Sequence, residues 1–163
     1  MELKQFLELF NPLPGNHYIQ VTSEIDATTF ALHEIIQAVE GEFRLALYTE
    51  EEQAIPAELH DVTIQQISKF NTPFRALPRD NDIVIFKDVF SKHSNPELLL
   101  RIAYTTLANT ADVIIMEKKG VMDVEVTKEL LEKFEFRAPN AIDVLDAYDL
   151  VMAKKMHMWG NGL

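Results

Sequence analysis

The stretch from residue 82 to residue 120 constrains the fold more than any other part of the sequence. Two short apolar runs, residues 83–86 and 113–116, flank a segment in which Asn95 can cap a helix and Pro96 can occupy its first turn. Successive residues of both runs are apolar, as expected of parallel strands that are buried on both faces. We therefore predict a strand–helix–strand unit.

The rest of the sequence alternates predicted helices and strands. Helices are expected at about residues 2–10, from Ser23 or Asp26 to Gly41, from Asn95 to about Ala108, and from Thr127; strands are expected at residues 18–22, 43–48, 62–67, 141–145 and 150–152. The turn between the last two strands is too short for a crossover helix, so this pair must be antiparallel. The sequence predicts an α/β fold, a three-layer Rossmann-like sandwich around a mainly parallel seven-stranded sheet, whose antiparallel last strand is inserted beside the fifth.

Length and charge limit the classes of function. The 163 residues suit a single domain over residues 1–163 that begins with the short helix at about 2–10. The formal net charge is −11 at pH 7, and the paired lysines, Lys118-Lys119 and Lys154-Lys155, are too few to form a basic groove. We therefore expect no binding to nucleic acid at physiological salt.

Residue usage excludes other kinds of site. The sequence has no cysteine, which excludes disulfides and thiolate metal sites, and its five histidines never pair at helical spacing, so no metal site is expected. No signal peptide opens the sequence, and no apolar run approaches the roughly 20 residues of a membrane-spanning helix. We expect a cytoplasmic protein without a membrane partner, and the sequence leaves open a small-molecule ligand and a homo-oligomer.

Several segments follow one another in an order that is typical of one family. These segments are Leu77-Pro78, Asp82-Ile83-Val84-Ile85, residues 87–93, residues 95–99 and the terminal run 148–155. Over about residues 17–156 the sequence resembles the class I S-adenosylmethionine-dependent methyltransferases. The resemblance implies the fold predicted above and S-adenosylmethionine as a cofactor.

The stretch after the first predicted strand departs from that family. The family has a glycine-rich loop there, which lets the backbone approach the cofactor, but residues 22–27 contain no glycine. Glu24 and Asp26 also place negative charge where the methionine carboxylate of the cofactor would lie. We therefore expect weak binding of S-adenosylmethionine, at a site lined by residues at the carboxyl ends of the first, second and fourth strands: Ser23, Asp26, Glu50 and Phe86.

Glu50 is the best match to the family's cofactor site. It follows the second strand, where the family has an acidic residue that accepts hydrogen bonds from the ribose hydroxyls. Glu50 is also one of three consecutive glutamates, so a solvated acidic turn is the alternative interpretation.

Candidate catalytic residues follow the fourth strand. Asp88 could orient a methyl acceptor and His93 could act as a general base, because both lie at the edge of the sheet where open α/β folds bind ligands. The alternative is that Asp88 is a surface charge of the loop and that His93 contributes to the start of the helix. The family's motif for methylation of amino groups, asparagine or aspartate followed by two prolines and an aromatic residue, is absent, which weakens a nucleic-acid amine as the acceptor.

Two functions from different classes remain. The first is an S-adenosylmethionine-dependent methyltransferase with an atypical cofactor loop, acting on a small molecule or a protein. The second is a catalytically inactive methyltransferase-like domain that serves as a binding or regulatory module. The missing glycines favour the second function, whereas Glu50 and the candidate catalytic residues favour the first.

Overall fold

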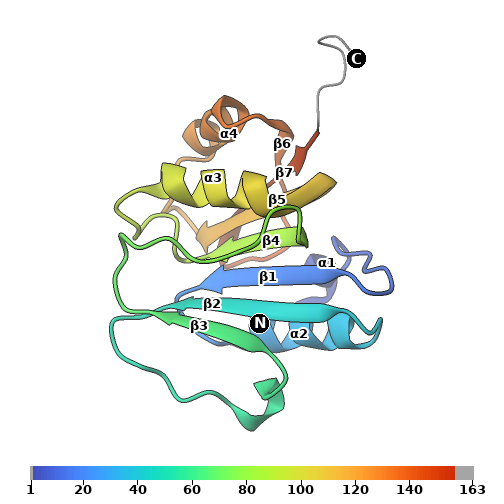
Figure 1. Cartoon of the computed structure of the whole chain (residues 1–163). Coiled ribbons are helices and arrows are strands. Elements are labelled where there is room, and N and C mark those ends of the chain that lie inside the picture. Colours follow the sequence, from blue (N-terminus) through green and yellow to red (C-terminus); the bar gives the residue numbers. More distant parts are fainter. Residues whose placement is uncertain (1, 157–163) are drawn as a thin grey trace.

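The computed structural model describes residues 2–156 and is built on one seven-stranded sheet (Figure 1). The strands are β1 (His17–Thr22), β2 (Glu42–Tyr48), β3 (Thr63–Ile67), β4 (Asn81–Lys87), β5 (Leu107–Lys118), β6 (Phe136–Ala141) and β7 (Tyr148–Lys155). The helices are α1 (Lys4–Leu7), α2 (Ala27–Gln37), α3 (Pro96–Thr106) and α4 (Val124–Lys133), with the 3-10 helix η1 (Ala57–Leu59). No helix of the described residues is long and apolar enough to cross a membrane.

The strand order is β3-β2-β1-β4-β5-β7-β6. β1 pairs in parallel with β2 and β4, and the parallel pairs β2–β3 and β4–β5 extend the sheet on both sides. β7 lies between β5 and β6 and is antiparallel to both of them. The predicted fold class is therefore confirmed, including the insertion of the antiparallel last strand beside the fifth.

Helices cover both faces of the sheet. On one face, Phe6 of α1 and Leu32 of α2 are completely buried. On the other face, Leu100 of α3 and Leu131 of α4 are completely buried against the strands. Figure 1 shows α3 and α4 on the same side of the sheet, over its β4-β5-β7 part.

Polar side chains begin the helices that follow β1 and β4. Asp26 caps α2, because its Oδ1 accepts a hydrogen bond from the Thr28 N–H at 3.0 Å. Asn95 caps α3 as predicted, because its Oδ1 accepts from the Leu98 N–H at 3.4 Å. Both caps lie at the carboxyl edge of the sheet and fix the loops of that edge.

Three element boundaries differ from the prediction. α1 covers only Lys4–Leu7, although Phe10 beyond it is also buried. α4 begins at Val124 rather than at Thr127, because Asp123 accepts a hydrogen bond from the Val126 N–H and starts the helix earlier. α3 ends at Thr106, and β5 follows it directly, well before the run at 113–116.

The predicted strand at residues 141–145 is wrong, because the sixth strand covers Phe136–Ala141. Pro139 lies inside this strand, at a shift of register between Arg137 and Asn140, and Ala138 has a left-handed backbone with φ of 53°. An edge strand tolerates such a proline, since its outer side needs no hydrogen-bond partner. Apolar and polar residues do not alternate regularly in this stretch, so the sequence showed no sign of a strand there.

Within residues 2–156, α-helices cover only part of the sheet face that carries α3 and α4, and none covers it near β3. The connections that flank β3 contain no α-helix: residues 49–62 hold only η1, and residues 68–80 run as an irregular segment. That segment covers β1 and β2 through Phe74, which is buried, and Phe70, which is half-buried. An extended segment therefore lies where another helix of this layer would pack.

Candidate functional site

A cavity of about 590 Å³ lies at the carboxyl edge of the sheet. Its lining comes from the residues that follow β1, β2 and β4, together with the end of β5 and the segment after β3. Open α/β sheets bind their ligands at this edge. We call it the carboxyl-edge cavity.

The lining of the carboxyl-edge cavity is strongly acidic. Its carboxylates are Glu24, Glu50, Glu51, Glu52 and Asp88, and its cations are Lys92 and Lys118. Because the carboxylates outnumber the lysines, the cavity carries a negative potential at neutral pH. A ligand that brings a further carboxylate or phosphate is therefore disfavoured.

A buried ion cluster closes the sheet edge between β1 and β4. Lys87, the last residue of β4, is completely buried, and its Nζ lies 2.6 Å from Asp26 Oδ2 and 3.0 Å from Asp88 Oδ2. The Tyr148 hydroxyl donates to Asp88 Oδ2 at 2.8 Å, and Lys87 Nζ lies 4.8 Å from the centre of the Tyr148 ring. We call these four residues the Lys87 cluster.

The protonation states of the cluster follow from its contacts. Burial by itself would lower the pKa of Lys87, but the hydrogen bonds with Asp26, Tyr148 and Asp88 outweigh it and hold that pKa above its ordinary value. Burial raises the pKa of Tyr148 to about 12, with the hydrogen bond to Lys87 acting in the opposite direction. At neutral pH Lys87 is therefore a cation and Tyr148 a neutral hydroxyl, so neither is a free base.

The loop between β1 and α2 contains no glycine and is held by its own hydrogen bonds. The Thr22 hydroxyl donates to the Glu24 carbonyl at 3.0 Å, and Asp26 accepts from both the backbone N–H and the hydroxyl of Thr28. No residue of this loop has a left-handed backbone. The carboxylate of Asp26 is thus engaged on one side by the start of α2 and on the other by Lys87.

The structure brings Ser23, Glu50 and Asp88 together in the lining of the carboxyl-edge cavity. Asp26 belongs to the Lys87 cluster and does not line the cavity. Phe86 is completely buried in the core, where its ring packs edge-on against the ring of Phe74 at 5.9 Å. Phe86 does not line the cavity, and the cofactor-binding roles of Ser23, Asp26, Glu50 and Phe86 stay predictions.

The two candidate catalytic residues are both held by the fold. Asp88 is 6% exposed, with a left-handed backbone at φ of 56°, and its carboxylate accepts from Lys87 and Tyr148. The Nδ1 atom of His93 accepts from the Asn95 N–H at 2.9 Å, so Nε2 carries the proton and donates to the Thr72 carbonyl at 3.0 Å. Both nitrogens of His93 are thus used inside the fold, which is the alternative role considered for this residue.

Neither Lys87 nor Tyr148 was predicted from the sequence to have a role in the site. One signal in the sequence does point to Lys87: it continues the alternation of Ile83 and Ile85, which are buried on one face of β4. No local pattern could have found Tyr148, because it meets Asp88 across 60 residues of sequence. Among the described residues, no group of acidic or histidine side chains could hold a metal ion.

Glu117 is expected to make the stability of the fold depend on pH. This carboxyl at the end of β5 is 1% exposed, and its Oε1 accepts from the Ser91 N–H at 2.7 Å. Burial raises its pKa above the ordinary value, although the hydrogen bond to Ser91 opposes the shift. A carboxyl whose pKa is higher in the folded state stabilises the fold below the unfolded pKa, and this stability is lost as the pH rises through the folded pKa.

We therefore expect Glu117→Gln, which keeps an acceptor for Ser91 but cannot ionise, to be more stable than the wild type near pH 7. The difference should disappear below about pH 4, where the wild-type carboxyl is protonated in both states. Urea unfolding of both proteins at the two pH values measures it. A difference that does not change with pH would show that Glu117 has no raised pKa.

Comparison with solved structures identifies the type of fold. A methyltransferase from Aquifex aeolicus, described as dependent on S-adenosylmethionine, superposes with a TM-score of 0.73 at 18% identity, over 94% of this chain and 89% of that one. A phosphoethanolamine N-methyltransferase of Haemonchus contortus in complex with S-adenosylmethionine gives a TM-score of 0.73 at 11% identity, over 95% of this chain and 52% of that one. The chain thus spans about half the length of the latter. It has a class I methyltransferase-like fold.

Sequence comparisons add nothing to this result. No protein-family model matches the sequence, and no curated protein matches it at a significant level. At identities of 18% and below, the structural similarity shows the fold alone. The function must be argued from the residues of the site.

Proposed function

We propose that this chain is a methyltransferase-like domain that does not transfer methyl groups and acts as a binding or regulatory module. The observation that carries the proposal is the Lys87 cluster. It fills the sheet edge between β1 and β4 with a buried ammonium and its two carboxylates, Asp26 and Asp88. The Lys87 ammonium lies within 3.0 Å of both carboxylates, so it already has its counter-ions and is not available to pair with a ligand carboxylate.

The residues present do not fit the methionine half of S-adenosylmethionine. The loop between β1 and α2 has a side chain at every position, so its backbone cannot come as close to a ligand as glycine allows. Glu24, which faces the cavity, repels a ligand carboxylate, and Asp26 is already neutralised by Lys87. A zwitterionic amino-acid end would have to displace an ion pair whose ammonium, that of Lys87, is completely buried.

The adenosine half fits better. Glu50 lines the carboxyl-edge cavity just beyond β2, where it can accept hydrogen bonds from ribose hydroxyls, and Phe70 offers a half-buried ring beside it. Because Glu50 is exposed, a charge-assisted hydrogen bond to it contributes less than the roughly 1.5–3 kcal/mol that such a bond is worth when it is shielded from water. Weak binding of a nucleoside-like ligand is therefore consistent with the site, even though the complete cofactor is not.

The two predicted catalytic residues are held by other contacts. A methyl acceptor that must lose a proton needs a base within hydrogen-bond reach. Both nitrogens of His93 are engaged by backbone groups, and Oδ2 of Asp88 accepts from Lys87 and Tyr148. These contacts disfavour His93 and Asp88 as the base that takes the proton of an acceptor.

A second function, S-adenosylmethionine-dependent methyl transfer to a small molecule or a protein, is favoured by one observation. The carboxyl-edge cavity has a volume of about 590 Å³, within the range of small-molecule sites, and it presents Glu50 at its wall. Acceptors that need no deprotonation would not require a base. This alternative stands if the complete cofactor binds tightly.

Calorimetric titration of S-adenosylmethionine separates the two functions. We expect the wild type to bind it with a dissociation constant of about 1 mM or weaker, because the loss of about 3–4 kcal/mol moves a micromolar site to that range. Glu50→Ala should weaken any residual binding further. Micromolar binding in the wild type that is abolished in Glu50→Ala would overturn the proposal and support methyl transfer.

A further inference from the structure

The segment at residues 68–80 creates a second surface, which shares no lining residue with the carboxyl-edge cavity. In place of a helix it lies on the sheet as a ribbon without regular secondary structure. Phe74 is buried and Ala76 half-buried, whereas Arg75 and Leu77 are exposed, Leu77 by 68%. The outer side of the ribbon therefore presents a cationic side chain next to an apolar one.

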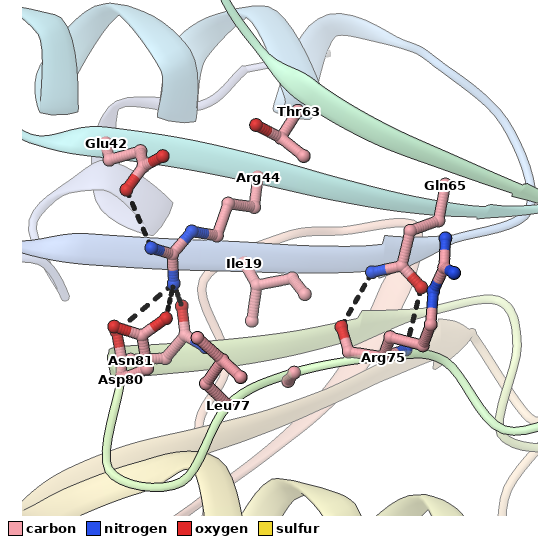
Figure 2. A pocket seen from close by; sticks show the side chains of 10 residues that line it. Ile19, Glu42, Arg44, Thr63, Gln65, Arg75, Leu77, Asp80 and Asn81 are labelled. Carbon is pink, nitrogen blue, oxygen red and sulfur yellow. Dashed lines mark hydrogen bonds and ion pairs between the residues drawn. The ribbon is translucent and has the colours of Figure 1, made fainter.

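The ribbon has a hollow on each side. One hollow, of about 360 Å³, separates it from α3 and has apolar walls that include Phe74, Leu98 and Ile102. The other, of about 400 Å³, lies between the ribbon and the sheet, over Ile19 of β1 (Figure 2). Both hollows are lined by Arg75 and Ala76, so together they form one surface that is divided by the ribbon.

Hydrogen bonds hold the ribbon in place. The side chain of Gln65 on β3 accepts from the Arg75 N–H and donates to the Arg75 carbonyl, both at 2.7 Å, as Figure 2 shows. At the other end, the Asp80 N–H donates to the Thr106 carbonyl at 2.8 Å, and the Arg79 N–H donates to the Thr105 carbonyl at 3.0 Å. The surface is therefore fixed before any partner binds, which lowers the entropic cost of binding.

Two arginines that line the hollow between the ribbon and α3 have no carboxylate partner among the described residues. Arg75 belongs to the ribbon, and Arg101 lies on α3, where its guanidinium is 5.6 Å from the centre of the Phe134 ring. By contrast, Arg44 in the other hollow forms ion pairs with Glu42 and Asp80. In a chain with a net charge of −11, the two unpaired guanidinium groups of Arg75 and Arg101 at one apolar hollow form a local cationic field.

We propose that this surface, here called the arginine groove, binds an acidic segment of a partner protein that also carries apolar side chains. The hollow beside Phe74 and Ile102 accepts the apolar side chains, and the guanidinium groups of Arg75 and Arg101 pair with carboxylates. The apolar walls favour such a segment over a nucleic acid, whose backbone would offer phosphates alone. The arginine groove is separate from the carboxyl-edge cavity, so this proposal and the proposed function succeed or fail independently.

The test uses a fluorescein-labelled helical peptide with a leucine face that is flanked on both sides by glutamates, and anisotropy as the readout. We expect a dissociation constant of about 100 μM or tighter at a physiological salt concentration of about 0.15 M. The same peptide with glutamine in place of glutamate should bind at least about tenfold more weakly, because it loses the charge pairing. A labelled single-stranded RNA should not bind.

Charge reversal locates the site. Arg75→Glu should weaken the acidic peptide by about tenfold, and Arg75→Glu/Arg101→Glu by more. Lys4→Glu, which makes the same change of net charge on the opposite face of the sheet, should leave the affinity unchanged, and circular dichroism should show that all variants are folded. Equal effects of Arg75→Glu and Lys4→Glu, equal binding of the glutamine peptide, preference for RNA, or no binding of the acidic peptide would each overturn the proposal.

Discussion

Replacement of Lys87 by methionine will lower the free energy of unfolding by about 3–5 kcal/mol, the usual cost of removing one partner of a buried ion pair. Methionine preserves most of the side-chain volume, so the effect isolates the charge. Asp26 keeps its hydrogen bonds to Thr28, and Asp88 keeps that of Tyr148, but both carboxylates lose the ammonium that lies 2.6 and 3.0 Å away. Urea unfolding monitored by circular dichroism measures the loss.

Lys92→Met is the matched control. Lys92 is an exposed residue of the carboxyl-edge cavity, and the same substitution there should change stability by no more than about 0.5 kcal/mol. Asp88→Asn in the Lys87→Met background should recover part of the stability, because it removes one of the two uncompensated carboxylates. A loss below about 1 kcal/mol in Lys87→Met would mean that the cluster is hydrated and weakly coupled.

Val84→Asp is expected to abolish folding. Val84 is completely buried in the middle of β4, paired with Ile19 on one side and Val113 on the other. An unpaired carboxylate at this position costs several kcal/mol, against a total stability of about 5–15 kcal/mol for a domain of this size. Circular dichroism and a thermal melt should show no cooperative transition.

Val126→Asp controls for the added charge. Val126 is 56% exposed in the first turn of α4, where an acidic residue suits the helix dipole. Its melting temperature should stay close to that of the wild type. If Val84→Asp also melted like the wild type, the assignment of β4 as the buried central strand would be wrong.

The fold could be predicted from the sequence because its central strands are buried on both faces. The runs at 83–86 and 113–116 gave the parallel pair β4–β5, and Asn95 with Pro96 gave the start of α3. The position of β6 could not be predicted, because Pro139 and the left-handed Ala138 interrupt the pattern of an edge strand. Edge strands depend less on burial, so they leave a weaker signal in the sequence.

The sequence predicted which residues of the candidate site follow the ends of strands, but not which side chains contact them. Ser23, Glu50 and Asp88 follow different strands, and the parallel sheet brings them to one edge. The partners of those residues were not predictable: Lys87 is buried by contacts with residues after β1 and on β7, far away in the sequence. Only the tertiary structure shows that Asp26, Lys87 and Asp88 form one ion cluster rather than separate charges at the ends of two strands.

We propose that the Lys87 cluster takes the place of a site for the amino-acid end of the cofactor. Parallel NMR titrations of the wild-type protein with adenosine and with S-adenosylhomocysteine test this. S-adenosylhomocysteine carries the homocysteine zwitterion in place of the 5′ hydroxyl of adenosine, and neither ligand has the sulfonium charge that the acidic cavity would attract in S-adenosylmethionine. We predict that S-adenosylhomocysteine binds no more tightly than adenosine. Binding that is tenfold tighter or more, a gain of about 1.4 kcal/mol from the amino-acid end, would contradict the claim.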